Sequence, residues 1–254
     1  VGRPSRTLDV GGNGPVELPF VGQVGGAVRG VAVAGHTAFV GHGPRVVAFD
    51  VTDPSAPLEI GRGPVLPGMV QTLAVAGDTL YAGTFGGLQV LDVSDPGVPA
   101  LVGSTPVATG KDWEVTDVLV AGDVAFVGDF MREVGIVMVD VSDPTAPTVI
   151  GPVPGSSGFV GLAYGDGFLY SGQGSRVAVY DVRDPAHPAE AGVAPALADV
   201  TDVLVADGHL YAASESEAGD GGATGGLTIY DLADPAHPVQ AGAVPIPLYQ
   251  PRIA

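Results

Sequence analysis

The segment VAFDVTDPSAPLEIG (Val47–Gly61) decides the fold, because the chain repeats it. Four related segments follow: VLDVSDPGVPALVG (Val90–Gly103), VMVDVSDPTAPTVIG (Val137–Gly151), VAVYDVRDPAHPAEAG (Val177–Gly192) and TIYDLADPAHPVQAG (Thr228–Gly242). The second aspartate of each copy falls at Asp53, Asp95, Asp143, Asp184 and Asp234, so the spacings are 42, 48, 41 and 50 residues. A repeat of about 40–45 residues built from short strands is typical of the blades of a β-propeller.

Four short β-rich segments make up one repeat. In the first copy they are GVAVAG (30–35), TAFVGH (37–42), RVVAFDV (45–51) and PLEIGRGPV (57–65), which we name strands A, B, C and D. Gly, Pro and Asp separate them, and no helical period is present. The sequence therefore predicts an all-β propeller of four-stranded antiparallel blades.

Two columns of large apolar residues recur at fixed positions. Strand B carries an aromatic residue in every copy: Phe39, Tyr81, Phe126, Tyr170 and Tyr211. Strand A carries a pair of apolar residues two positions apart: Val31/Val33, Leu73/Val75, Val118/Val120, Leu162/Tyr164 and Val203/Val205. One blade cannot bury such faces alone, so we expect neighbouring blades to bury them against each other.

The repeat predicts five full blades, at about 27–68, 69–113, 114–157, 158–198 and 199–247 of a single domain, 1–254. The segment TLDVGGNGPVELPFVGQV (Thr7–Val24) fits a degenerate C–D pair, and LYQPRIA (248–254) fits the start of a strand A. We therefore expect a sixth blade split between 1–26 and 248–254. A five-bladed ring with a spare strand pair, or a fragment of a larger propeller, are the alternatives.

The aspartates of the repeated segment have a structural explanation. Asp53, Asp95, Asp143, Asp184 and Asp234 each precede a proline, and a second proline opens strand D. An aspartate at the start of a turn accepts backbone N–H bonds, while proline presets φ for the next position. Five calcium sites are the alternative, but each copy offers only two carboxylates.

These residues carry a resemblance to a known family. The segment GLQVLDVSDPGVPALVG (Gly87–Gly103), preceded by LAVAGDTLYAG (Leu73–Gly83), resembles the LVIVD repeat of bacterial and archaeal surface proteins. Similar units run from about residue 27 to residue 247. The resemblance implies a β-propeller that is surface-exposed or secreted, and it implies no general catalytic residues.

Composition excludes several classes of function. The net charge is −18 with a single lysine, so an acidic surface should repel nucleic acids and anionic lipid headgroups. The absence of cysteine excludes disulfides and thiolate metal sites, and no apolar run is long enough to span a bilayer. No leader is visible, although a chain that starts at Val1 is compatible with a removed one. The extracellular or cell-surface location that we expect is what the resemblance to the LVIVD repeat implies.

The repeat is irregular on one face of the expected ring. Lengthened segments occur around 108–117, 129–135 and 214–226, in B–C and D–A loops, and loops that vary over a rigid scaffold commonly bind partners. Two of these loops hold the candidate contact residues, which combine aromatic and charged side chains: Lys111, Asp112, Trp113, Glu114, Phe130, Met131, Arg132 and Glu133. The alternative is that Trp113 folds over its own blade.

A second set of candidates lies where strands approach the channel on the same face. Asp117 and Asp202 start strands A, while Asp129 and His42 end strands B. If they converge, carboxylate oxygens suit calcium, and the added imidazole suits a transition metal. Solvated carboxylates at an acidic pore mouth are the alternative, and no other cofactor is expected.

Two functional hypotheses follow. The first is a non-catalytic interaction or scaffold propeller that binds a protein or cell-surface glycan, or other subunits of a surface assembly, through its B–C and D–A loops. The second is a metal-dependent hydrolase or lyase with a site at the channel mouth, which rests on analogy between propellers.

Overall fold

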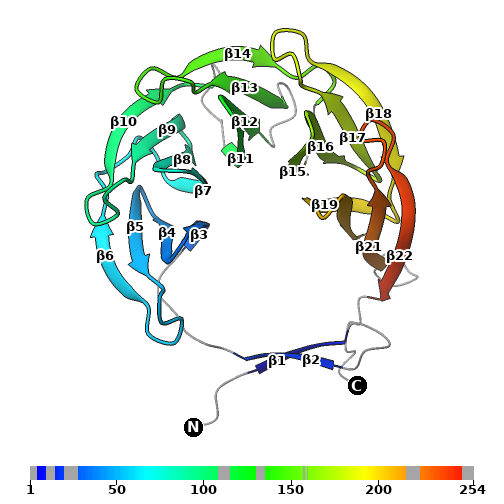
Figure 1. The fold of residues 1–254 in the computed structure, drawn as a ribbon, viewed down its shortest axis with the longest axis horizontal. Coiled ribbons are helices and arrows are strands. Elements are labelled where there is room, and N and C mark those ends of the chain that lie inside the picture. Colours follow the sequence, from blue (N-terminus) through cyan, green and yellow to red (C-terminus); the bar gives the residue numbers. More distant parts are fainter. Residues whose placement is uncertain are drawn as a thin grey trace, which may run out of the picture.

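A computed structural model describes residues 5–9, 15–19, 28–107, 115–129, 135–156, 158, 160–215 and 224–247. These residues form five four-stranded antiparallel sheets and one two-stranded sheet, and they contain no helix. Figure 1 shows the five large sheets as blades around a central axis, with β3, β7, β11, β15 and β19 innermost. The predicted all-β propeller with five full blades is confirmed.

Each blade runs outward in the order A, B, C, D. Blade one comprises β3 (Val28–Ala34), β4 (Thr37–His42), β5 (Arg45–Asp50) and β6 (Leu58–Arg62). Blade two comprises β7 (Val70–Ala76), β8 (Thr79–Thr84), β9 (Gly87–Asp92) and β10 (Ala100–Thr105). Blade three comprises β11 (Val115–Ala121), β12 (Val124–Asp129), β13 (Ile136–Asp140) and β14 (Thr148–Pro152). Blade four comprises β15 (Val160–Gly165), β16 (Phe168–Gln173), β17 (Arg176–Asp181) and β18 (Ala189–Pro195), and blade five comprises β19 (Asp199–Ala206), β20 (His209–Glu215), β21 (Thr224–Asp231) and β22 (Val239–Pro247).

The A–B hairpins are closed by two-residue turns whose first residue has a positive φ. In blade two this residue is Gly77, with a φ of 57°, as a type II′ turn requires. In blades four and five the turns are Asp166-Gly167 and Asp207-Gly208, with positive φ at both positions, as in a type I′ turn. Both turn types match the right-handed twist of the strands that they connect, so strands A and B pair in the same way in all five blades.

The apolar columns meet between the blades. Each boundary between consecutive blades holds a cluster of buried residues, in which the strand-B aromatic of one blade joins the first strand-A aliphatic of the next. The four pairs are Phe39 with Leu73, Tyr81 with Val118, Phe126 with Leu162, and Tyr170 with Val203. The core of the protein is therefore a series of interfaces between blades, as the columns predict.

A glycine in strand D brings some blades into backbone contact. A Cβ added at Gly103 would lie 2.2 Å from the carbonyl oxygen of Pro144 in the next blade, and one at Gly192 would lie 2.3 Å from that of Ala236. Gly242, at the same position of blade five, would meet nothing within 4 Å. Gly151 also meets nothing, and its φ of 155° differs from that of the others.

The sixth position of the ring holds a strand pair. Strand β1 (Ser5–Asp9) pairs antiparallel with β2 (Pro15–Pro19), and Figure 1 shows this pair in the gap between blades five and one. Asp9 lies opposite Pro15, just as Asp50 lies opposite Leu58 in strands C and D of blade one. The five-residue connection between β1 and β2 is shorter than the seven residues of each C–D connection, so the pair stays a prediction as strands C and D of a sixth blade, and the predicted contribution of 248–254 lies outside the described residues.

Candidate functional site

The repeated aspartates hold the C–D turns. In blade three, Asp140 accepts the backbone N–H of Ser142 at 2.9 Å, and Asp143 accepts that of Thr145 at 2.9 Å. The backbone N–H of Ala146 also binds the carbonyl oxygen of Asp143 at 3.0 Å. The other four blades repeat the two carboxylate bonds at the positions predicted from the sequence, which are Asp53, Asp95, Asp184 and Asp234 together with their preceding partners Asp50, Asp92, Asp181 and Asp231. All ten carboxylates thus have a local role in turns.

Connection lengths differ between the two faces of the ring. On the A–B and C–D face, all A–B turns have two residues and all C–D connections have seven. On the opposite face, the B–C connections have two residues in blades one, two and four, but six in blade three and eight in blade five. The D–A connections on that face range from three to nine residues.

The predicted partner-binding residues belong to the lengthened connections. Lys111, Asp112, Trp113 and Glu114 precede β11, whereas Phe130, Met131, Arg132 and Glu133 follow β12. All eight lie outside the described residues. Their flanking strands are described, and both segments leave blade three on the face where the connections vary.

Asp117 lies on the innermost strand of blade three and bonds to blade four. Its Oδ2 accepts the backbone N–H of Leu162 in β15 at 3.0 Å. Burial raises the pKa of its carboxyl from 3.8 to about 6, and the nearby carboxylate of Asp202 adds to the rise, while the N–H groups of Leu162 and Val118 lower it. The side chain thus joins two blades and is ready to take up a proton near neutral pH.

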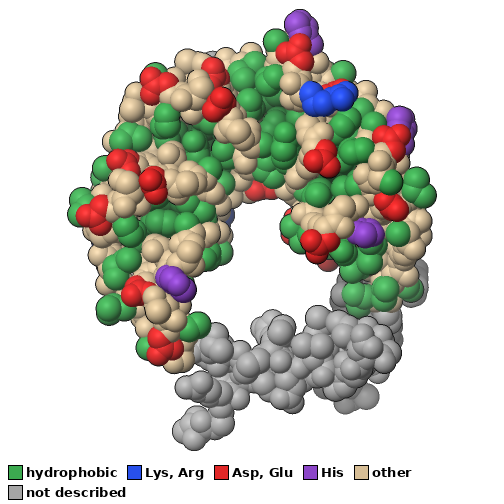
Figure 2. All heavy atoms as spheres, in the orientation of Figure 1, with side chains coloured by type: hydrophobic (Ala, Val, Ile, Leu, Met, Phe, Trp, Pro, Cys, Tyr) green, Lys and Arg blue, Asp and Glu red, His purple; other side chains and the backbone are tan. Residues whose placement is uncertain are grey.

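Asp202 occupies the same position in β19 and is exposed. Its Oδ1 accepts the backbone N–H of Val203 at 2.9 Å and lies close to Gly161, where an added Cβ would be 2.8 Å away. Its carboxylate is near enough, across blade four, to add a small rise to the pKa of Asp117. Figure 2 shows the open centre of the ring, with carboxylates along its edge.

The residues that end strand B do not approach the channel as expected for Asp129 and His42, because strand A lies between strand B and the axis. Thr84 is buried, with its Oγ1 3.0 Å from the carbonyl oxygen of Pro67. The Nε2 of Gln173 donates to the hydroxyl of Tyr180 at 2.7 Å. Asp129 ends β12, and its side chain lies outside the described part of the structure.

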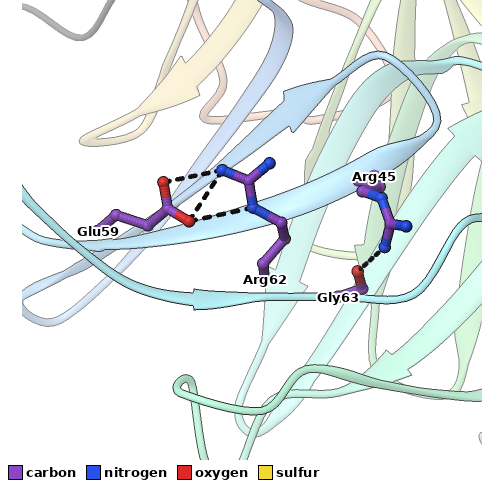
Figure 3. A network of polar contacts seen from close by, with 4 residues as sticks. All are labelled: Arg45, Glu59, Arg62 and Gly63. Atoms are coloured by element: carbon purple, nitrogen blue, oxygen red, sulfur yellow. Dashed lines mark hydrogen bonds and ion pairs between the residues drawn. The ribbon is translucent and has the colours of Figure 1, made fainter.

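His42 instead lines a groove on blade one, together with Val28, Glu59 and Arg62. Figure 3 shows Arg62 paired with Glu59 at 2.9 Å on the same blade. Within the described residues, no three His, Asp or Glu side chains gather closely enough to hold a metal ion. The structure thus brings Asp117 near Asp202 and leaves His42 apart from them.

Sequence reasoning missed a cavity of about 400 Å³ between blades three and four on the A–B and C–D face. Tyr164 stacks on Phe126 there with ring centres 6.2 Å apart, and the guanidinium of Arg183 lies 5.0 Å from the centre of the Phe168 ring. Comparison of the copies carries a signal, because Tyr164 replaces a valine present in the other four blades. Arg183 likewise replaces a small residue.

The described residues include no helix long and apolar enough to cross a membrane. A search of curated proteins finds no match.

Solved structures show similarity in fold. The computationally designed protein Ika8 is 13% identical with a TM-score of 0.63, and the match covers 86% of this chain and 61% of that one. A Bacteroides fragilis protein whose name proposes a 6-phosphogluconolactonase is 14% identical with a TM-score of 0.68, over 92% of this chain and 79% of that one. The WD40 β-propeller domain of Doa1 is 12% identical with a TM-score of 0.63, over 92% and 73%. At these identities the similarity concerns the fold alone.

A family model matches the sequence itself. The LVIVD repeat model matches residues 25–63, 67–106 and 114–154, which are the first three blades. Blades four and five repeat the same strand order, turn aspartates and apolar columns. The chain therefore belongs to the LVIVD-repeat family.

Proposed function

We propose that this propeller is a non-catalytic binding scaffold that contacts a protein or cell-surface glycan through its B–C and D–A loops. One observation carries the proposal. Every connection on the A–B and C–D face keeps its length in all five blades, whereas the lengthened connections all leave the opposite face. Variation confined to one face of a constant framework is the pattern of a recognition surface.

The framework beneath those loops is well suited to hold them. The strands before and after them, β11, β12 and β13, carry residues of the buried clusters, such as Val115, Val127 and Ile136. Rigid elements reduce the entropy lost when a loop is ordered by a partner. Aromatic and basic residues within the loops, above all Trp113, Phe130 and Arg132, are the types that dominate binding energy at interfaces.

The test begins with a screen of the purified 254-residue protein on a glycan array and against surface-protein extracts. The double variant Trp113→Ala/Phe130→Ala should then weaken binding to the partner by roughly tenfold or more, with the melting temperature nearly unchanged. The matched control is His187→Ala/His237→Ala, because both histidines are exposed in C–D turns of the opposite face. Equal losses in both variants, or a large fall in melting temperature, would contradict the proposal.

We also propose an exported or cell-surface location, on the basis of the family and the acidic composition. Antibody labelling of intact cells, with and without added protease, measures this directly. A signal that appears only after the cells are lysed is incompatible with this location.

A metal-dependent hydrolase or lyase is the second candidate, supported by the fold similarity to a protein named for lactonase activity and by the proton-binding Asp117 at the channel. A metal that remains at one equivalent after dialysis, and a melting temperature lowered by EDTA, would favour it. The scaffold proposal expects neither result.

A further inference from the structure

Blade four departs from the repeat at the cavity of about 400 Å³ that it shares with blade three. Tyr164 stands where the other four blades have valine, and Arg183 stands where they have threonine, serine or alanine. Both side chains line the cavity. Because the other blades fold with smaller residues at these two positions, the architecture of a blade does not require the two large side chains.

An aromatic ring forms one wall of the cavity. The ring of Tyr164 stacks on that of Phe126 of blade three, with the ring centres 6.2 Å apart and an angle of 27° between the ring planes. Phe126 is 2% exposed, whereas Tyr164 is 38% exposed. The buried ring therefore supports the tyrosine ring, and part of the tyrosine ring remains accessible at the cavity.

Arg183 forms another wall, and its charge is already paired. Its Nε donates to Oδ1 of Asp181 at 2.9 Å, and its guanidinium carbon lies 5.0 Å from the centre of the Phe168 ring. The hydrogen bonds from Arg183 lower the pKa of the Asp181 carboxyl to about 2. Gly167 leaves room for this arrangement, because a Cβ there would lie 2.3 Å from Cγ of Arg183.

Asp123 adds a negative charge that is not paired. It is the second residue of the A–B turn of blade three, it is exposed, and it lines the cavity opposite blade four. Its carboxylate makes no hydrogen bond or ion pair with any residue that the structure describes. Asp123 and Arg183 are the charged residues that line the cavity, and only the charge of Arg183 is compensated, by Asp181.

We propose that the cavity between blades three and four binds a small alkylammonium cation. The cationic group lies against the ring of Tyr164 and pairs with the carboxylate of Asp123, while Val124 and Val182 contact the hydrocarbon part of the ligand. The face of an aromatic ring attracts ammonium groups because its π-electrons carry negative charge. The volume of the cavity lies within the range of small-molecule sites.

The charges favour a cation over an anion. An anionic ligand would need the guanidinium of Arg183, whose Nε and Nη2 already donate to Asp181. It would also be repelled by Asp123 at the same cavity and by a chain whose net charge is −18. The site lies on the face opposite the lengthened loops, so it does not depend on the binding function proposed for them.

The experiment uses choline as the probe, because its neutral isostere 3,3-dimethyl-1-butanol has the same shape without the charge. Each compound is titrated into the 254-residue protein, and the ring signals of the tyrosines are followed by NMR. Choline should shift the Tyr164 signals with saturation in the millimolar range, and the isostere should bind about fivefold more weakly or worse. Equal binding of the two compounds, or no saturable shift at Tyr164, overturns the proposal.

Variants of the two walls locate the site. Tyr164→Val restores the residue of the other blades and should weaken choline binding, followed by calorimetry, by about fivefold with little change in melting temperature. Asp123→Asn should weaken it by about threefold and reduce its dependence on salt. Asp78→Asn is the matched control, since Asp78 is exposed at the same turn position of blade two, and it should leave binding unchanged.

Two results from the variants would contradict the cation site. Choline affinity that is the same in the wild type, Tyr164→Val and Asp123→Asn would place the ligand elsewhere and overturn the proposal. Inorganic phosphate is the second probe. If it shifts the Tyr164 signals of the wild type with saturation but not those of Arg183→Thr, the cavity binds anions, which also overturns the proposal.

Discussion

Val118 and Val31 are the same residue at the same position of the repeat, yet Val118 is 5% exposed and Val31 is 62% exposed. Val118 lies on the strand-A face of blade three that packs against the preceding blade, in the cluster that contains Tyr81 of blade two. Val31 lies on the same face of blade one, beside the gap. The difference teaches that the repeat specifies a blade, whereas the position of that blade in the ring decides what its faces contribute to stability.

The largest expected effect comes from the strand-D glycines. Gly103→Ala should lower the free energy of unfolding by about 3 kcal/mol, because its Cβ would clash with the carbonyl oxygen of Pro144 in the next blade. Gly242→Ala should change it by less than about 0.5 kcal/mol, because a Cβ there meets nothing within 4 Å. Urea denaturation of both variants measures the difference. Equal destabilisation would mean that blade five has a following neighbour in solution.

The two valines give the next largest contrast. Val118→Ala should cost about 2 kcal/mol, since it removes buried methyl groups and leaves a cavity between blades two and three. Val31→Ala should cost less than about 0.5 kcal/mol. If urea denaturation shows that Val31→Ala lowers the free energy of unfolding as much as Val118→Ala does, the strand-A face of blade one that carries Val31 is covered in the free protein.

Asp117 should give a pH dependence of about 1–2 kcal/mol, after allowance for its partial exposure. The folded protein keeps the proton of Asp117 up to about pH 6, while an unfolded aspartate releases it near pH 3.8. The contribution of this group to the free energy of unfolding therefore falls as the pH rises from about 4 to 6, and is level above that. Denaturation from pH 4 to 8 should show this fall in the wild type relative to Asp117→Asn. Parallel pH profiles of the free energy of unfolding in the wild type and Asp117→Asn would exclude this contribution of Asp117.

The smallest contrast involves two tyrosine hydroxyls. The hydroxyl of Tyr170 donates to the carbonyl oxygen of Pro235 in blade five at 2.9 Å, so Tyr170→Phe should cost about 1 kcal/mol. Tyr211 has the same position in blade five and faces the gap, so Tyr211→Phe should be nearly neutral. Thermal denaturation of the two variants checks this. A larger loss of stability for Tyr211→Phe than for Tyr170→Phe would contradict the assignment of Tyr211 to the side of blade five that faces the gap.

Much of the fold follows from the sequence because the repeat can be compared with itself. The turn aspartates and the two apolar columns fix the strand order, and the aromatic of one blade meets the aliphatic of the next, as with Phe126 and Leu162. The exposure of Val31 could not be predicted in this way, because the first copy of a repeat resembles the others and the gap before it depends on ring geometry.

The channel was harder to predict than the blades. Asp117 and Asp202 were expected at the channel mouth, and Asp202 adds a small rise to the pKa of Asp117, but the burial that mainly raises this pKa depends on how closely β11 approaches β15. His42 was expected nearer the axis, and the order of strands in the sheet places it one strand farther out. The cavity beside Tyr164 needed the packing of two blades to become visible.

The contact between a strand-D glycine and the carbonyl of the next turn has a consequence for how this protein can diversify. Where it occurs, at Gly61, Gly103 and Gly192, main chain rests on main chain at the outer edge of the ring. At this edge the angular step between those blades is limited by main-chain contact in addition to the buried side chains between the blades, so it does not depend on the side chains exposed along the edge. Loops on the far face can lengthen, shorten or exchange residues while the curvature that presents them stays the same.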